Sequence, residues 1–345
     1  MLSPEFLAGH VVWNSRQQIR PARESYNPTM NMKHRNLVTG PALVALLFPL
    51  AALAQVPLLT PWGDPDLQGI WDRRTITPLE RPEQFADQEF LTEEQVAAYE
   101  QRGRERDDGR PPDAPRAGIS VHAPEDLDYG SLVLSTRQTA LIVDPPDGQI
   151  PPLTEAARAR RARERAEAAS HGDADSWLDR SLFERCIARG IPEGMLPGPY
   201  NNNTQIIQTP DNVLIHNEMI HETRVIPLDD RPHLPSTIKQ WLGDSRGYWD
   251  GNTLVVETTN FSDKMSFRGA RENLQVVERF TRADPETLMY EFTVTDPTTW
   301  IRPWTVSFPM RRTEGPVYEY ACHEGNHALR NILSTARYLE QQDNN

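Results

Sequence analysis

From about residue 204 onwards, apolar and polar residues alternate with a period of two, which is typical of half-buried β-strands. Short turns rich in Gly, Pro, Asp and Asn separate these segments. Strands joined by such short turns pair antiparallel. The chain therefore predicts a mainly β fold, either an antiparallel up-and-down barrel of the lipocalin-like kind or a strongly curved sheet. The expected strands are 204–209, 213–226, 247–249, 253–259, 274–282, 287–295, 302–312 and 317–321.

Before residue 201 the chain is rich in proline and charge and has few periodic segments. Thr92 and Gln95 have the spacing of a helix capping box, and Thr154 is a second N-cap candidate. We expect residues 55–200 to wrap around a barrel formed by residues 201–345, as one integrated domain. This part should contain strands at 67–71 and 139–143 and helices at 93–102, 155–170 and 181–189, and a last helix should cover 328–339.

The start of the chain has the order of a secretory signal. Met32-Lys33-His34-Arg35 is basic, residues 37–53 are mostly apolar, and Ala52-Leu53-Ala54 offers the small residues that signal peptidase reads. Prolines interrupt the apolar run, which argues against a membrane anchor. We expect residues 1–54 to be an upstream extension plus a removed signal peptide. The mature chain would begin at Gln55, be secreted or periplasmic, and have no integral membrane segment.

The charge of the chain indicates which partners it can bind, and its cysteine content indicates the cellular compartment. The chain has 36 Lys and Arg against 49 Asp and Glu, a formal net charge of −13, and loss of residues 1–54 makes it more negative. Such a surface repels phosphate backbones, so we expect a small-molecule ligand and no nucleic acid. The two cysteines, Cys186 and Cys322, both remain in the mature chain. In an oxidising compartment they predict one disulfide, with two buried thiols as the alternative.

Several strings carry a resemblance to known proteins. The run WLGDSRGYWDGNTLVVETTNF at 241–261, Asp296-Pro297, Pro303-Trp304 and ACHEGN at 321–326 resemble a large family of exported bacterial proteins usually labelled hypothetical. The likeness covers residues 60–340 and implies export, but it brings no established activity or catalytic residues. Gly69-Ile70-Trp71 also resembles the G-x-W motif of lipocalin-type barrels, which implies a barrel only.

Strand alternation places several polar residues on the apolar face that should point inward. Burying an unpaired charge costs free energy, so these groups either pair with one another or face a water-filled cavity. The cavity interpretation makes His221, Glu278, Asp296, Arg302 and Tyr290 candidate catalytic residues. The candidate substrate-binding residues are Asn217, Trp300, Trp304, Tyr200 and Asn202.

In this interpretation His221 with Glu278 or Asp296 provides acid-base groups, and Arg302 holds an anionic or carbonyl oxygen. The alternative is a structural plug, in which a carboxylate is locked to Arg302. A bulge in a strand would exchange the two faces.

Two histidine-containing segments suggest metal binding. His323-Glu324-Gly325-Asn326-His327 matches the letters H-E-x-x-H of zinc peptidases, but Gly325 and Asn326 are poor helix-interior residues. The other candidate cluster is His216-Asn217-Glu218 with His221 and Glu222, but on a regular strand His216 and Glu218 face away from His221, which disfavours shared coordination. We therefore predict no metal.

The chain also lacks a G-x-S-x-G elbow, a phosphate loop and a dinucleotide fingerprint, so no cofactor is expected. The sequence favours an exported, cofactor-independent lyase, isomerase or hydrolase that acts on a small, ring-containing molecule. The alternatives are a lipocalin-like carrier of a small apolar ligand and a structural envelope protein.

Overall fold

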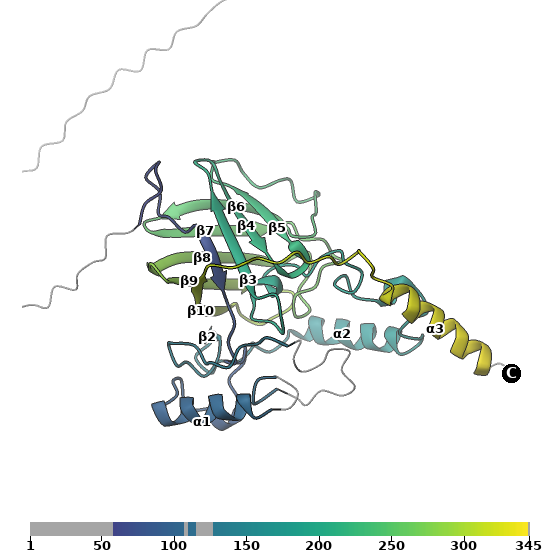
Figure 1. Ribbon diagram of the computed structural model, residues 1–345. Helices are drawn as coiled ribbons and strands as arrows, with labels where there is room; N and C mark the ends of the chain where they lie inside the picture. Colours follow the sequence, from purple (N-terminus) through teal and green to yellow (C-terminus); the bar gives the residue numbers. More distant parts are fainter. Residues whose placement is uncertain (1–57, 107–109, 115–126, 344–345) are drawn as a thin grey trace, which may run out of the picture. The chain divides into compact units, whose positions relative to one another are not determined.

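The computed structural model describes residues 58–106, 110–114 and 127–343 (Figure 1). All of them belong to one compact unit, Ala54–Asn345. The described chain forms a ten-stranded antiparallel sheet with three α-helices, which confirms the mainly β prediction. The expected signal peptide and the residues before it lie outside the described ranges.

The strands follow one another closely after residue 203, as the alternation pattern predicted. They are β1 Gly69–Asp72, β2 Ile142–Asp144, β3 Asn203–Gln208, β4 Asn212–Asn217, β5 Thr223–Pro227, β6 Asp244–Asp250, β7 Thr253–Thr259, β8 Gln275–Asp284, β9 Thr287–Thr295 and β10 Trp304–Thr313. The α-helices are α1 Glu93–Arg104, α2 Glu155–Ala168 and α3 Ala328–Asp343, and the 3-10 turns are η1 Glu83–Phe85, η3 Trp177–Asp179, η4 Glu193–Met195 and η5 Met219–His221.

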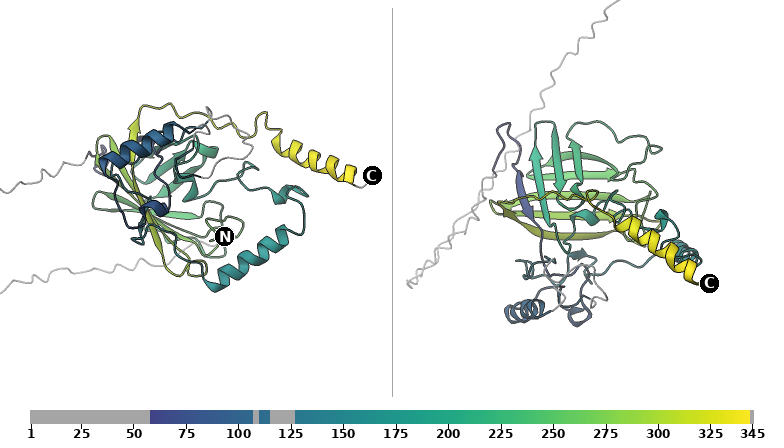
Figure 2. Two further views of the ribbon diagram at one scale, coloured as in Figure 1. Left: turned by 90° about the horizontal axis from the view of Figure 1, so that it is seen from below. Right: turned by 45° about the vertical axis from the view of Figure 1, so that its right-hand side comes forward.

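The sheet is strongly curved but does not close. Its strand order is β5-β4-β3-β1-β10-β9-β8-β7-β6, and β2 adds to β10. Strands β3 to β5 cross over strands β7 to β10, so the sheet folds over onto itself (Figure 2). The end strands β5 and β6 point the same way but share no backbone ladder, and this leaves an open seam between them. The two edges still touch, since a Cβ on Gly247 would lie 2.8 Å from Cγ2 of Ile226.

The main core lies on the concave face of the sheet and includes the fully buried side chains of Trp71, Phe280 and Phe308. A smaller cluster packs Ile76 and Tyr99 beneath α1. The α1 capping box is confirmed, because the Thr92 side chain accepts from the Gln95 N–H and the Gln95 side chain accepts from the Thr92 N–H. Within the described ranges, no helix combines the length and the apolar character needed to cross a bilayer.

The prediction of a single strand at 213–226 is wrong. These residues form the hairpin of β4 and β5, which η5 separates. In η5, Ile220 and His221 have positive φ angles of 58° and 46°. A regular strand of that length would exceed the usual 3–10 residues. The interruption also changes which residues face inward. Arg224 is buried, whereas Val225 is 58 % exposed.

Two other expected elements are absent. Residues 317–321 form no strand, because the Tyr318 N–H donates to a Glu218 side-chain oxygen at 2.8 Å instead of joining a ladder. Residues 181–189 form turns rather than a helix, and Cys186 there has a φ of 57°. A segment this short forms a helix only when packing supports it. The predicted disulfide between Cys186 and Cys322 is confirmed, with a Cα–Cα distance of 5.8 Å.

Candidate functional site

A buried ionic cluster occupies the inside of the curved sheet. Arg224 on β5 donates to both carboxylate oxygens of Glu278 on β8, at 2.6 and 2.8 Å. The Tyr290 hydroxyl on β9 donates to the same carboxylate at 2.9 Å. Burial, reinforced by the Glu278 charge, raises the pKa of Tyr290 well above its usual value.

Glu278 and Tyr290 were expected to face inward, and both are completely buried. The partner of Glu278 is Arg224, however, not Arg302. Two parallel hydrogen bonds and a hydroxyl satisfy this carboxylate, which is the arrangement of a structural plug.

Asp296 and Arg302 do not join this cluster. The Asp296 carboxylate accepts from the Thr298 N–H at 2.9 Å and from the Thr299 hydroxyl at 2.8 Å, so it stabilises the turn after β9. The expectation that Arg302 points inward is wrong, because its side chain is 47 % exposed and pairs with Asp144 at 2.9 Å. Strand β10 begins only at Trp304, so the alternation does not extend back to Arg302.

The expected substrate-binding residues do not surround one cavity. Trp300 and Trp304 are buried in the core, edge to face at 5.6 Å between ring centroids. The Asn202 side chain bonds the backbone N–H and C=O of Gly198 at 2.8 and 2.9 Å. Asn217 is buried and accepts from the Thr204 hydroxyl at 2.9 Å, while Tyr200 hydrogen-bonds Tyr320. These contacts stabilise turns and strands.

His221, by contrast, lines an open cavity of about 510 Å³ at one end of the seam. A second cavity, of about 230 Å³, shares part of its wall and runs along the facing edges of β5 and β6. We call the larger of the two the seam cavity. Its walls include Ile187, Ile220, His221, Glu222, Lys239 and Trp241.

The orientation of the His221 ring is fixed by one backbone contact. Its Nδ1 lies 3.0 Å from the carbonyl oxygen of Tyr320. A carbonyl only accepts hydrogen bonds, so Nδ1 carries the proton and Nε2 keeps a lone pair when the ring is neutral. The positive φ angles of Ile220 and His221 are unusual for residues with a Cβ, and such strain often accompanies functional sites.

Glu222 contributes a buried carboxyl group to the same wall and is only 7 % exposed. Its Oε1 accepts from the N–H groups of Arg189 at 2.5 Å and Gly190 at 3.0 Å. Its Oε2 has no partner among the described residues. A Cβ on Gly194 would lie 3.1 Å from Oε2, so this glycine leaves room for the carboxyl group. Burial raises the pKa of Glu222, and the two backbone N–H bonds oppose that rise only in part.

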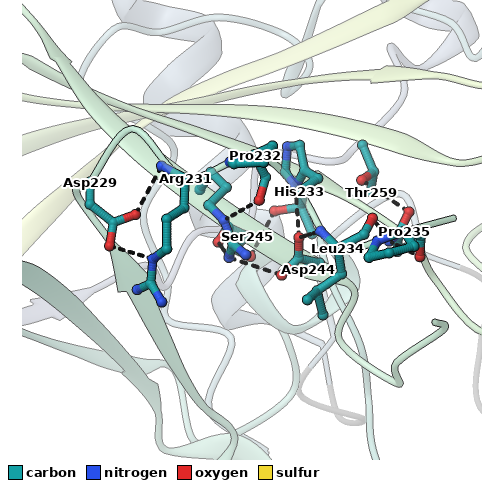
Figure 3. A network of polar contacts seen from close by, with 12 residues as sticks. Asp229, Arg231, Pro232, His233, Leu234, Pro235, Asp244, Ser245 and Thr259 are labelled. Atoms are coloured by element: carbon teal, nitrogen blue, oxygen red, sulfur yellow. Dashed lines mark hydrogen bonds and ion pairs between the residues drawn. The ribbon is translucent and has the colours of Figure 1, made fainter. Parts of the chain in front are cut away.

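The loop between β5 and β6 supplies Lys239 and Trp241 to the opposite wall. Asp244, at the start of β6, fixes this loop (Figure 3). One of its carboxylate oxygens accepts from the Leu234 N–H and from His233 Nδ1, both at 2.9 Å. The other pairs with Arg246 at 2.9 Å. A loop held by a buried carboxylate gives the cavity a defined wall.

Sequence reasoning missed Arg224, Lys239 and Trp241 and considered Glu222 only as part of a possible metal cluster. Neither Glu222 nor Arg224 was placed on the inner face, because 213–226 was treated as one strand. Its excessive length, together with Asn217-Glu218 in its middle, was the signal for a turn. Lys239 and Trp241 lie in a segment without periodicity, which gives no face assignment.

The histidine segments do not form a metal centre. In the part of the chain that the structure describes, no three His, Cys, Asp or Glu side chains gather in a way that could hold a metal ion. His323 and His327 do not share a helix, because α3 begins at Ala328. His216 bonds the Thr223 hydroxyl at 2.8 Å.

No protein-family model matches the chain, and no curated protein shows significant similarity to it. The chemistry of the seam cavity is therefore the main guide to function.

Proposed function

We propose that this protein is an exported enzyme that binds a small molecule in the seam cavity and moves a proton with His221. The observation that carries the proposal is the His221 ring, which Tyr320 orients so that Nε2 is the free basic nitrogen. General bases are commonly oriented in this way, through a hydrogen bond on the other ring nitrogen.

Glu222 adds a buried carboxyl group to the wall beside His221. A carboxylate beside an imidazole would favour the protonated ring, but burial raises the pKa of Glu222 and so favours its uncharged form.

Lys239 and Trp241 define the substrate that would fit. Both are exposed on the loop wall. An ammonium group attracts an anionic or carbonyl oxygen, and an indole face packs against a ring. The proposed substrate is therefore a small ring-bearing molecule with such an oxygen, and the reaction is that of a lyase, isomerase or hydrolase. No cofactor is required for this step.

Export remains part of the proposal and is supported by the Cys186–Cys322 disulfide, which is typical of oxidising compartments. Membership of the family of exported bacterial proteins is proposed on the quoted strings. The carrier alternative receives less support, because the expected lining residues Glu278, Tyr290 and Trp304 are fully buried.

The test is proton exchange in D2O, measured by NMR, on a panel of aromatic ketones and keto acids. We expect exchange at the carbon next to the carbonyl, above the rate without protein. His221→Gln should lower this rate by about 100-fold, the usual scale for one general base. His171→Gln, which changes an exposed histidine outside the cavity walls, is the matched control. Exchange that persists unchanged in His221→Gln would contradict the proposal.

Binding is tested separately with benzoate and phenylacetate as probes. We expect both to shift the His221 and Trp241 NMR signals, and Lys239→Met to weaken binding by about tenfold. Lys264→Met, which removes an exposed lysine outside the cavity walls, should leave binding unchanged. Equal losses in the two lysine variants would show that Lys239 has no specific role.

A further inference from the structure

The C-terminal segment 314–322 runs from the end of β10 past β3 towards α3 without joining the sheet (Figure 1). Besides the hydrogen bond between Tyr200 and Tyr320, three contacts through backbone atoms hold it there. Pro316 O accepts from the Asn203 side chain at 3.4 Å, the Tyr318 N–H donates to Glu218, and Tyr320 O accepts from His221. At its end, Cys322 is cross-linked to Cys186. We call segment 314–322 the strap.

Each half of the disulfide lies next to a group that holds one of the two titratable residues of the site. On the strap, Tyr320 comes two residues before Cys322, and its carbonyl orients His221. On the other side, Arg189 and Gly190 come three and four residues after Cys186. Their N–H groups hold Glu222 Oε1.

The residues between these points form the cavity wall itself. Ile187 and Ala188 follow Cys186 directly and line the seam cavity. The segment around them forms turns rather than a helix, so it has no regular hydrogen-bonded frame of its own. The cross-link thus joins two irregular segments, one of which contacts His221 and the other Glu222.

We propose that the Cys186–Cys322 disulfide is a positioning element of the seam cavity, which fixes the Nδ1–H tautomer of His221 and the hydrogen-bonded position of Glu222. A role of the disulfide in catalysis rests on the proposed function. Its effect on the His221 ring does not depend on that function. Without the bond, the strap is held by hydrogen bonds such as those to Glu218 and His221, and beyond it α3 is held through Arg337, which donates to the Asp175 carbonyl at 2.7 Å. The Tyr320 carbonyl then no longer fixes which His221 nitrogen carries the proton.

The experiment measures the His221 tautomer by NMR of protein labelled with 15N-histidine. The His221 signals are assigned by their loss in His221→Gln. Oxidised protein should show a protonated Nδ1 and an unprotonated Nε2 at a pH above the histidine titration. Reduction with dithiothreitol, or the double change Cys186→Ser with Cys322→Ser, should give averaged shifts from both tautomers. Reoxidation of the reduced protein should restore the original signals.

Leu91→Ala is the matched control for lost stability. Leu91 is buried in the cluster under α1, so its truncation destabilises the fold away from the strap. This variant should keep the Nδ1–H tautomer. Where the reduced protein unfolds, trimethylamine N-oxide is added to restore the fold before the measurement. A fixed Nδ1–H tautomer in folded protein without the disulfide would overturn the proposal.

Proton exchange separates this inference from the proposed function. If both hold, the double serine variant loses exchange by about tenfold or more through misplacement of the base. If only the positioning holds, the tautomer changes although oxidised protein shows no exchange. If only the function holds, exchange and tautomer are the same with and without the bond.

Discussion

Arg224 and Glu278 form a two-pronged ion pair inside the curved sheet, with hydrogen bonds of 2.6 and 2.8 Å and almost no exposure to solvent. Removing one partner of such a buried pair leaves the other charge uncompensated. We expect Glu278→Gln and Arg224→Met each to lower the free energy of unfolding by about 3–5 kcal/mol in urea titrations.

A double variant and a surface control make this prediction specific. Arg224→Met combined with Glu278→Leu should recover most of the loss, because an apolar pair leaves no stranded charge. Arg302→Met removes a half-exposed pair with Asp144 and should cost less than about 1 kcal/mol. Single variants with stability near wild type would show that Glu278 is not a structural plug.

Glu222 should lower the stability of the folded protein as the pH rises. Burial raises its pKa in the folded protein, so the folded state binds this proton more tightly than the unfolded chain does. Unfolding free energy is therefore lost as the pH rises from the ordinary glutamate pKa of about 4.3 through the raised value. Glu222→Gln should be increasingly more stable than wild type over that window, as followed by urea titration at several pH values. A constant difference would contradict the raised pKa.

Asp244 should control the mobility of the loop that carries Lys239 and Trp241. Asp244→Asn weakens the bonds to the Leu234 N–H, His233 and Arg246. We expect faster hydrogen–deuterium exchange across residues 232–243, measured by mass spectrometry. Asp229→Asn, which changes an exposed pair with Arg231, is the control and should leave exchange in this loop unchanged.

The contact across the seam can be tested at Gly247. A Cβ there would lie 2.8 Å from Ile226, so Gly247→Ala should cost about 1–3 kcal/mol by overpacking. In an Ile226→Ala background the clashing methyl group is gone, and the same change should cost less. Additive losses in the double variant would mean that the two edges do not touch in solution.

Export predicts a defined start of the mature chain. Protein recovered from the extracytoplasmic fraction should begin at Gln55, and its mass should rise by about two hydrogens on reduction of one disulfide. Intact-mass spectrometry checks both points. A retained residue 1–54 segment, or two thiols that react with alkylating agents without reductant, would refute this route.

The fold was more accessible from the sequence than the site. Strands β7 and β9 were predicted with their bounds because half-buried strands alternate strictly and end at turn residues such as Asp250-Gly251-Asn252. The inward position of Glu278 and Tyr290 followed from the same alternation. The ion-pair partner of Glu278 could not be predicted in this way, because it depends on which strands lie opposite each other in the folded sheet. Arg224 reaches Glu278 only through the folding of β5 back over β8.

The seam cavity is built mainly from residues that have no periodicity. His221 was predicted as a functional residue for the wrong reason, as part of a continuous strand. In the structure it lies in η5, and the segment that orients it is about a hundred residues further along the chain. Such a contact leaves no local pattern in the sequence.

The open seam of the main sheet has a mechanical consequence. Among the described strands, β5 and β6 share no backbone ladder, and side-chain contacts such as that of Ile226 with the backbone at Gly247 lie across the seam. Separating these edges breaks no hydrogen bond between neighbouring strands. The seam is thus the line along which the wall can widen while every ladder stays intact, and both cavities lie on that line.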